Sequence, residues 1–251
     1  MNRVNYKTLF SKISNGMGIL NTIKDSILNL VFPINCISCG VSGVDLCINC
    51  IRDFPSAERE SAEWIFPLYD YRHPPVKKAL WLLKYKDKKR LAKIFAEILY
   101  GNIIEELSDL SVMQNFTDAI LIPIPLSKKR YRERGYNQAE LICKELVKID
   151  QATYLRDSVN MSKPNFTLIG DILIKPKETK HQAHIENRSE RLKNIVGSFA
   201  VKNAEGNISL IKGKNIILID DITTTGATLA EARKILKQSG ARKIIAFTIA
   251  H

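Results

Sequence analysis

The hydrophobic positions of this chain follow two spacings. Short apolar runs bounded by turn residues are typical of buried parallel strands, and we expect such strands at residues 119–125 and 216–219. Further strands are expected at residues 64–71, 172–174 and 243–250. Between these runs apolar residues recur at helical spacing, which predicts helices that begin near Pro74, Leu91, Asn137, Asn187 and Leu229. Strands that alternate with helices favour βαβ units, so the sequence predicts an α/β domain built on a parallel sheet.

A further helical pattern occupies the N-terminal residues. Apolar side chains at Ile19, Ile23 and Ile27 predict an amphipathic helix within residues 1–31, which Pro33 ends. This helix either packs on its own protein or a partner, or makes peripheral contact with a membrane surface. No apolar run approaches the roughly 20 residues of a helix that spans a bilayer. The segment also lacks the apolar core of a signal peptide, so we expect a cytoplasmic protein.

Four of the five cysteines lie within the segment CISCGVSGVDLCINC, residues 36–50. Two CxxC pairs are formed by Cys36, Cys39, Cys47 and Cys50. Four thiolates satisfy tetrahedral Zn²⁺ with no open position, so such a metal would be structural. Disulfides or free thiols are the alternatives, but disulfides are rare in proteins without a secretion signal. We therefore expect a zinc ribbon over residues 32–55 and, after a polar linker, a main domain over residues 60–251.

The charge balance suits anionic partners. The 251 residues include 38 basic and 26 acidic side chains, a net charge of +12, which favours nucleic acid, pyrophosphate or an anionic membrane surface. Basic side chains gather at residues 84–90 and at residues 128–134, the second just beyond a predicted strand end. Solvated connections between helices are the alternative explanation. As contacts for pyrophosphate or DNA we single out Lys84, Lys128, Arg130 and Arg134, with Tyr85 as a surface for base stacking.

The most informative stretch is NIILIDDITTTGATL, residues 215–229. Asp220 and Asp221 directly follow a predicted strand, and a hydroxyl-rich loop around Gly226 leads into a predicted helix. Small residues let backbone N–H groups approach an anion, and the helix N-terminus adds its positive dipole end. Carboxylates suit the vicinal hydroxyls of a sugar, or a divalent cation beside it. The pattern predicts a site for a ribose 5-phosphate.

This stretch resembles the signature of type I phosphoribosyltransferases. In that family the two acids hold the ribose 2- and 3-hydroxyls of phosphoribosyl pyrophosphate (PRPP), and the loop cups its 5-phosphate. The resemblance implies a site for PRPP with Mg²⁺, formed by Asp220, Asp221, Thr223, Thr224, Thr225, Gly226, Ala227 and Thr228. No acceptor site or general base is recognisable, so no catalytic residue is assigned.

Other motifs resemble the ComF/GntX family. PIPLSKKRYRERGYNQAE, residues 123–140, is similar to a signature of that family, with Tyr136 where the family has Phe. LKY at residues 83–85, and the stretch from Gln182 through RSERLKNIVGSFAV at residues 188–201, are similar to further family motifs. Members join an N-terminal zinc ribbon to a phosphoribosyltransferase-like domain, so the resemblance implies that architecture here.

The same resemblance implies a role in DNA uptake during natural transformation, with single-stranded DNA and the uptake machinery as partners. Two alternatives stay open: transfer of a phosphoribosyl group from PRPP to a base or amine, and PRPP sensing without turnover. Asn2 and an early zinc module stand where a glutamine amidotransferase has its N-terminal cysteine. We therefore do not expect ammonia to be taken from glutamine.

Three smaller expectations concern the middle of the chain. Residues 151–171 are polar and irregular, and are interpreted as an insertion. His181 and His184 have a spacing that can bind metal, but without further ligands nearby they are interpreted as exposed polar residues. Cys143 lies among apolar residues of a predicted helix and is interpreted as a core residue rather than a nucleophile.

Overall fold

The computed structural model describes residues 34–58, 62–156, 163–176, 195–202 and 205–251. The chain divides into two units, Met1–Cys50 and Ile51–His251, which are described separately. The helix predicted within residues 1–31, the pair His181 and His184, and the helix predicted from Asn187 lie outside the described residues. Within the described ranges, no helix has both the length and the apolar character needed to cross a membrane.

The described part of the first unit is built from tight turns. The backbone N–H of Gly40 donates to the carbonyl of Cys36 at 2.9 Å. The backbone N–H of Cys36 donates to the carbonyl of Val41 at 2.8 Å. Gly40 and Gly43 have φ angles of 77° and 99°, which a residue with a side chain adopts only with strain. A short helix, α3 (Ile48–Arg52), begins in this unit.

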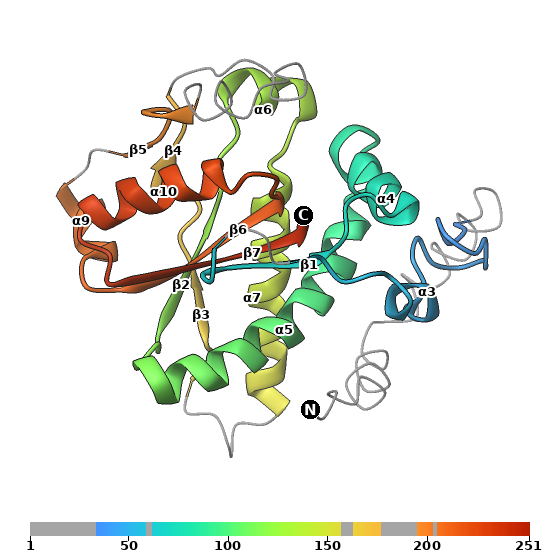
Figure 1. Ribbon diagram of the computed structural model, residues 1–251, viewed down its shortest axis with the longest axis horizontal. Coiled ribbons are helices and arrows are strands. Elements are labelled where there is room, and N and C mark those ends of the chain that lie inside the picture. Colours follow the sequence, from blue (N-terminus) through green and yellow to red (C-terminus); the bar gives the residue numbers. More distant parts are fainter. Residues whose placement is uncertain (1–33, 59–61, 157–162, 177–194, 203–204) are drawn as a thin grey trace. The chain divides into compact units, whose positions relative to one another are not determined.

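The second unit is organised around a five-stranded parallel sheet with the strand order β1-β7-β6-β2-β3. Figure 1 shows these strands fanned by the sheet twist. Their bounds are Ile65–Tyr69 for β1, Lys243–Ala250 for β7, Asn215–Ile222 for β6, Ala119–Pro123 for β2 and Phe166–Leu168 for β3. A separate antiparallel pair is formed by β4 (Leu173–Ile174) and β5 (Ala200–Val201). The predicted α/β fold with a parallel sheet is confirmed.

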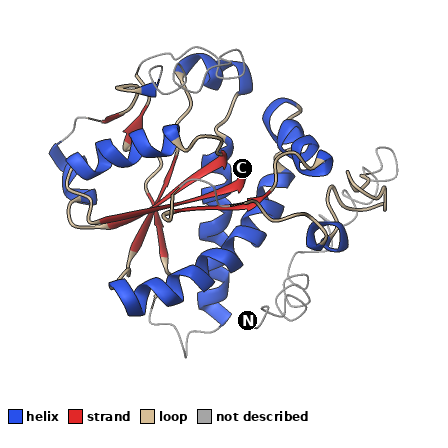
Figure 2. Cartoon of the chain, in the orientation of Figure 1, coloured by secondary structure: helices blue, strands red, loops and turns tan. Residues whose placement is uncertain are grey.

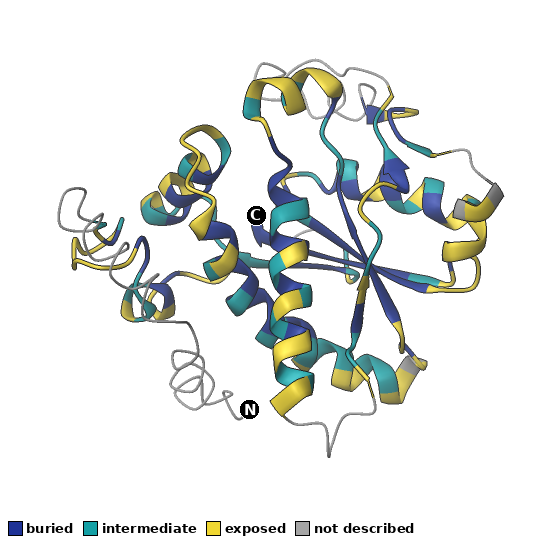
Figure 3. Ribbon diagram, turned by 180° about the vertical axis from the view of Figure 1, so that it is seen from behind, coloured by how far each residue is buried: buried dark blue, intermediate teal, exposed yellow. Residues whose placement is uncertain are grey.

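Helices cover both faces of this sheet (Figure 2). On one face, Ile120, Ile216 and Ile244 join a buried cluster with Leu229 and Leu236 of α10 (Ala227–Gln238). On the other face, α5 and α7 pack together, and α7 also packs on β2, β3 and β6. The remaining helices of the described part are α4, α6 and α9, and Figure 3 shows buried strands between partly exposed helices. The bounds are Pro74–Tyr85 for α4, Arg90–Gln114 for α5, Lys128–Arg134 for α6, Gln138–Arg156 for α7 and Glu205–Ile211 for α9.

The irregular structure expected at residues 151–171 is wrong for the described part of this segment. Helix α7 continues to Arg156, and Phe166 pairs with Ala119 as the first residue of the edge strand β3. A buried side chain fixes this strand: Asp150 accepts hydrogen bonds from the backbone N–H of Phe166 at 2.9 Å and from Asn165 Nδ2 at 2.8 Å. The sequence of this segment does not predict a strand, because the carboxylate of Asp150 in α7 holds β3 in place and the segment has no apolar pattern of its own.

Cys143 is fully buried in α7, which confirms its interpretation as a core residue. Burial raises the pKa of its thiol well above the ordinary value. A thiol in that state is a poor nucleophile.

Candidate functional site

The site lies at the carboxyl end of β6, the middle strand of the sheet, where parallel sheets bind ligands. A cavity of about 320 Å³ opens there, and its walls come from α6, from the ends of α4, β2, β4 and β6, and from the beginnings of α7 and α10. Asp220 and Asp221 are part of β6 itself, and Asp220 is paired in register with Thr248 of β7. The two acids are therefore held by the sheet rather than by a loop.

The loop after β6 connects the two acids to the N-terminus of α10. The N–H of Thr223 donates to the carbonyl of Ala250 at 2.9 Å, which holds the loop beside β7. Gly226 has a φ of 72° and is the N-cap of α10. A Cβ atom added to Gly226 would lie 3.1 Å from Cδ1 of Ile65, so both space and conformation favour glycine. The loop thus leads into a helix N-terminus that faces the cavity, an arrangement that suits an anion.

The two aspartates differ in their surroundings. Asp221 forms an ion pair with Lys84, whose Nζ lies 3.0 Å from Oδ1 of Asp221. Asp220 accepts a hydrogen bond from the backbone N–H of Asp221 at 2.8 Å. Burial and the adjacent charge of Asp221 raise the pKa of Asp220 to about 7, against the opposing effect of Lys84 and Lys175. One acid is therefore neutralised by a lysine, whereas the other titrates near neutral pH.

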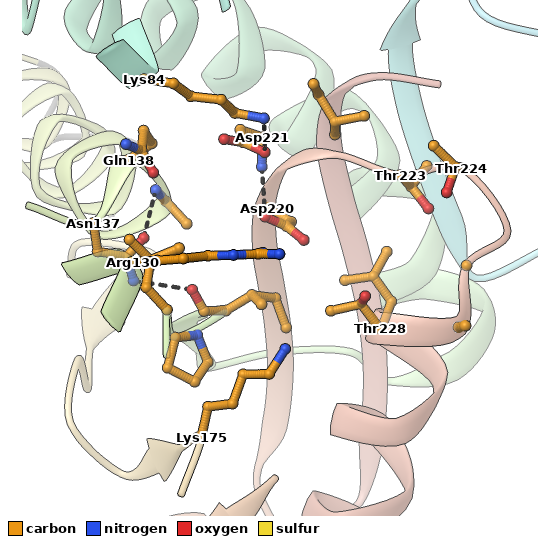
Figure 4. Close-up of a pocket in the computed structure, with 18 of the residues that line it drawn as sticks. Lys84, Arg130, Asn137, Gln138, Lys175, Asp220, Asp221, Thr223, Thr224 and Thr228 are labelled. Carbon is orange, nitrogen blue, oxygen red and sulfur yellow. Dashed lines mark hydrogen bonds and ion pairs between the residues drawn. The ribbon is translucent and has the colours of Figure 1, made fainter. Parts of the chain in front are cut away.

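Cations face the hydroxyl loop across these acids. Figure 4 shows Lys84, Arg130 and Lys175 on one side of β6 and the threonine side chains on the other. Burial and the charge of Arg130 lower the pKa of Lys175 to about 8, although Asp220 raises it. Arg134 also lines the cavity, whereas Lys128 is exposed on α6 and does not. The structure thus gathers three of the four singled-out cations with all eight residues of the implied PRPP site.

The four cysteines of the first unit also lie together. Their sulfur atoms lie within 4.8 Å of one another, and Sγ of Cys39 and Cys47 are 3.6 Å apart. Tetrahedral Zn²⁺ with bonds of about 2.3 Å to sulfur requires sulfur atoms about 3.8 Å apart, so the donor set fits that metal. The backbone N–H of Cys47 lies 3.4 Å from Sγ of Cys36. Burial opposes ionisation of Cys36, but backbone N–H groups outweigh it and lower the pKa of this thiol to about 6.

Comparison with known proteins shows a phosphoribosyl transferase domain and similarity to competence proteins. The family model for the phosphoribosyl transferase domain matches residues 176–251. Competence protein ComFC of Streptococcus pneumoniae is 33% identical over 159 residues, which cover 63% of this chain and 56% of that protein. Competence protein F of Haemophilus influenzae is 26% identical over 212 residues, 82% of this chain and 81% of that protein. DNA utilization protein YhgH of Shigella flexneri is 22% identical over 212 residues, 83% of this chain and 80% of that protein.

The chain is similar to proteins of the ComF family. Among solved structures, a hypoxanthine phosphoribosyltransferase from Staphylococcus aureus aligns with a TM-score of 0.32 and 11% identity, over 64% of this chain and 62% of that one.

Further residues line the cavity that were not predicted from the sequence. Gln138 is buried, and its Oε1 accepts a hydrogen bond from Arg134 Nη1 at 2.9 Å. Its Nε2 has no partner among the described residues. Asn137 caps α7 by accepting a hydrogen bond at its Oδ1 from the backbone N–H of Ala139, and its Nδ2 donates to the carbonyl of Ile124. Both belong to the RERGYNQ motif, which was the signal that could have marked them, and Lys175 had no such signal.

Proposed function

We propose that this cavity binds PRPP together with Mg²⁺. The observation that carries the proposal is the placement of Asp220 and Asp221 between a hydroxyl-lined helix N-terminus and a cluster of cations. PRPP needs three kinds of contact at once: acceptors for its ribose hydroxyls, N–H donors for its 5-phosphate, and positive charge for its pyrophosphate. The lining of the cavity offers all three, with the acceptors between the N–H donors and the positive charge.

Each group of PRPP is assigned to residues in the same order. Asp220 and Asp221 accept hydrogen bonds from the ribose hydroxyls, with Lys84 retained on one oxygen of Asp221. The 5-phosphate binds to the loop formed by Thr223, Thr224, Thr225, Gly226, Ala227 and Thr228. Arg130, Arg134 and Lys84 neutralise the pyrophosphate, and Mg²⁺ would be held between pyrophosphate oxygens and the acids, because it prefers oxygen ligands.

A calorimetric titration of the full chain with PRPP, in Mg²⁺ and in EDTA, tests this assignment. We expect Asp220→Asn and Asp221→Asn each to weaken PRPP binding by roughly tenfold or more, since a charged hydrogen-bond partner contributes about 1.5–3 kcal/mol. Asp118→Asn is the matched control, because Asp118 is an exposed acid that lines a different cavity. Unchanged PRPP affinity in both site variants would refute the assignment.

For the cellular role, we propose a competence function in which the protein acts on incoming single-stranded DNA in the cytoplasm, with the uptake machinery as partner. The names of the ComFC and competence protein F relatives support this role, as does the net charge of +12. The four-cysteine unit would carry structural Zn²⁺. The test is the transformation frequency of a deletion strain that carries either the parent gene or the Asp220→Asn/Asp221→Asn double variant. Full complementation by the double variant would show that the competence function does not need the cavity.

Transfer of the phosphoribosyl group is a second candidate function. Arg130 and Lys175 favour it, because departure of pyrophosphate needs positive donors placed where negative charge develops. Release of pyrophosphate from PRPP in the presence of a panel of bases and amines would establish transfer. Saturable binding of PRPP without release, across the whole panel, would instead identify a sensor.

A further inference from the structure

Helix α4 exposes two aromatic side chains beside the cavity. Trp81 is 47% exposed and Tyr85 is 50% exposed. They are one turn apart, with ring centroids separated by 6.3 Å and ring planes inclined at 46°. The opposite face of α4 is the buried one, because Val76, Leu80 and Leu83 are fully covered. The exposed outer surface of α4 is visible in Figure 3. Packing of the described chain therefore does not account for this aromatic pair.

Positive charge surrounds both rings. Nζ of Lys86 lies 5.3 Å from the ring centroid of Trp81, and Cζ of Arg134 lies 5.1 Å from that of Tyr85. Lys77, one turn before Trp81, is also exposed. The sequence of α4, PPVKKALWLLKY, contains no acidic residue. A ligand that covers this surface should thus combine flat apolar groups with negative charge.

The aromatic pair is connected to the PRPP cavity by hydrogen bonds. Arg134 donates through Nη2 to the hydroxyl of Tyr85 at 3.3 Å and through Nη1 to Oε1 of Gln138 at 2.9 Å. Arg134 and Gln138 line the cavity, and so does Lys84, the residue before Tyr85. A chain of contacts therefore runs from the exposed rings to the cavity wall.

We propose that Trp81 and Tyr85 form a base-stacking platform for single-stranded DNA, with Lys86 and Arg134 contacting the adjacent phosphates. The choice of DNA rests on the proposed function. Unpaired bases stack on aromatic side chains regardless of sequence, and basic groups beside the rings hold the backbone. Duplex DNA cannot use the platform in the same way, because its bases already stack on one another. The platform brings a strand to the rim of the cavity on the side assigned to pyrophosphate.

Fluorescence anisotropy with a labelled oligothymidylate and the full chain tests the platform. We expect Trp81→Ala and Tyr85→Ala each to weaken binding about tenfold, since stacking contributes about 1–3 kcal/mol per base and 1.4 kcal/mol is tenfold. Trp81→Phe and Tyr85→Phe should recover most of the affinity. The matched control is Tyr131→Ala, because Tyr131 is also 50% exposed and lies on the basic helix α6. This control should change affinity less than twofold.

Two further measurements distinguish base stacking from phosphate contacts. Binding of the same variants to a duplex of equal length should not change, because phosphate contacts alone carry it. Tryptophan fluorescence of the parent chain should be quenched by oligothymidylate, and this quenching should disappear in Trp81→Ala, which retains Trp64. Wild-type affinity for the single strand in both alanine variants would overturn the platform. The platform would also be overturned if the alanine variants lost duplex binding to the same extent. It would be overturned as well if these variants lost only binding to anionic vesicles, or only self-association.

The outcome is independent of the PRPP assignment. The oligonucleotide titrations contain no PRPP, and PRPP affinity is measured separately on Trp81→Ala, where it should be unchanged. A parent chain that binds oligothymidylate through the rings but does not bind PRPP would overturn the cavity assignment and leave the platform standing. A parent chain that binds PRPP but no single strand would overturn the platform alone.

Discussion

At the scale of single residues, Asp220 is a group of the cavity whose charged form the fold disfavours. Its pKa rises from 3.8 to about 7, first through burial and then through the charge of Asp221. Between these two pH values the folded chain binds a proton at Asp220 that the unfolded chain has released. Without ligand, the contribution of Asp220 to the free energy of unfolding therefore falls as pH rises from about 4 to 7.

We expect Asp220→Asn to remove this pH dependence. The variant should be more stable than the parent chain at pH 8, by up to roughly 4 kcal/mol, because the pKa is raised by about three units and each pKa unit corresponds to about 1.4 kcal/mol. The difference should shrink toward pH 5, where the parent carboxyl is protonated. Urea unfolding of both chains at several pH values measures it, with Asp118→Asn as an exposed control. A stability difference that does not vary with pH would contradict the raised pKa.

At the scale of elements, a single carboxylate joins three of them. Asp150 of α7 is fully buried and accepts hydrogen bonds from the hydroxyl of Tyr100 in α5, from Asn165 and from the first residue of β3. Burial and this carboxylate raise the pKa of Tyr100 to about 12, so its hydroxyl stays a donor. The edge strand therefore depends on a helix side chain as well as on its pairing with β2.

Replacing Asp150 with alanine should detach β3. The change leaves the hydroxyl of Tyr100 and the N–H of Phe166 buried without their acceptor, and we expect a loss of about 3 kcal/mol in the free energy of unfolding. Amide hydrogen exchange should accelerate at residues 166–168 before it does at β6. Asp109→Ala, on the exposed surface of α5, should leave both quantities unchanged. Normal protection of β3 in Asp150→Ala would show that strand pairing alone holds it.

The strands also show how much of the fold could be predicted from the sequence. The strands β2, β6 and β7 were predictable because each is a continuous apolar run, and the acids of β6 were predictable because they end such a run. The strand β3 was not, since it has three residues and its order comes from Asp150. Lys175 was missed for a related reason. It reaches the cavity only after elements distant in sequence pack together, which no local pattern records.

At the scale of the whole molecule, the two units should differ in what holds them together. The second unit buries an extended core on both faces of its sheet, whereas the described part of the first unit buries few apolar side chains. A segment of that size folds only when metal binding supplies the free energy. Metal removal should therefore affect one unit and spare the other.

We expect purified protein to contain about one Zn²⁺ per chain, because four thiolates complete a tetrahedral site. Cys36→Ser and Cys39→Ser should each lower the zinc content, and a strong chelator should expose residues 34–50 to amide exchange and proteolysis. The sheet of the second unit should keep its protection, since its core contains no cysteine of the cluster. Cys143→Ala is the matched control and should retain zinc, because Cys143 lies in α7 outside the cluster. Zinc retained in Cys36→Ser, or full protection of residues 34–50 after chelation, would mean that these turns fold without metal. In that case their hydrogen bonds, such as the one from Gly40 to Cys36, would have to suffice.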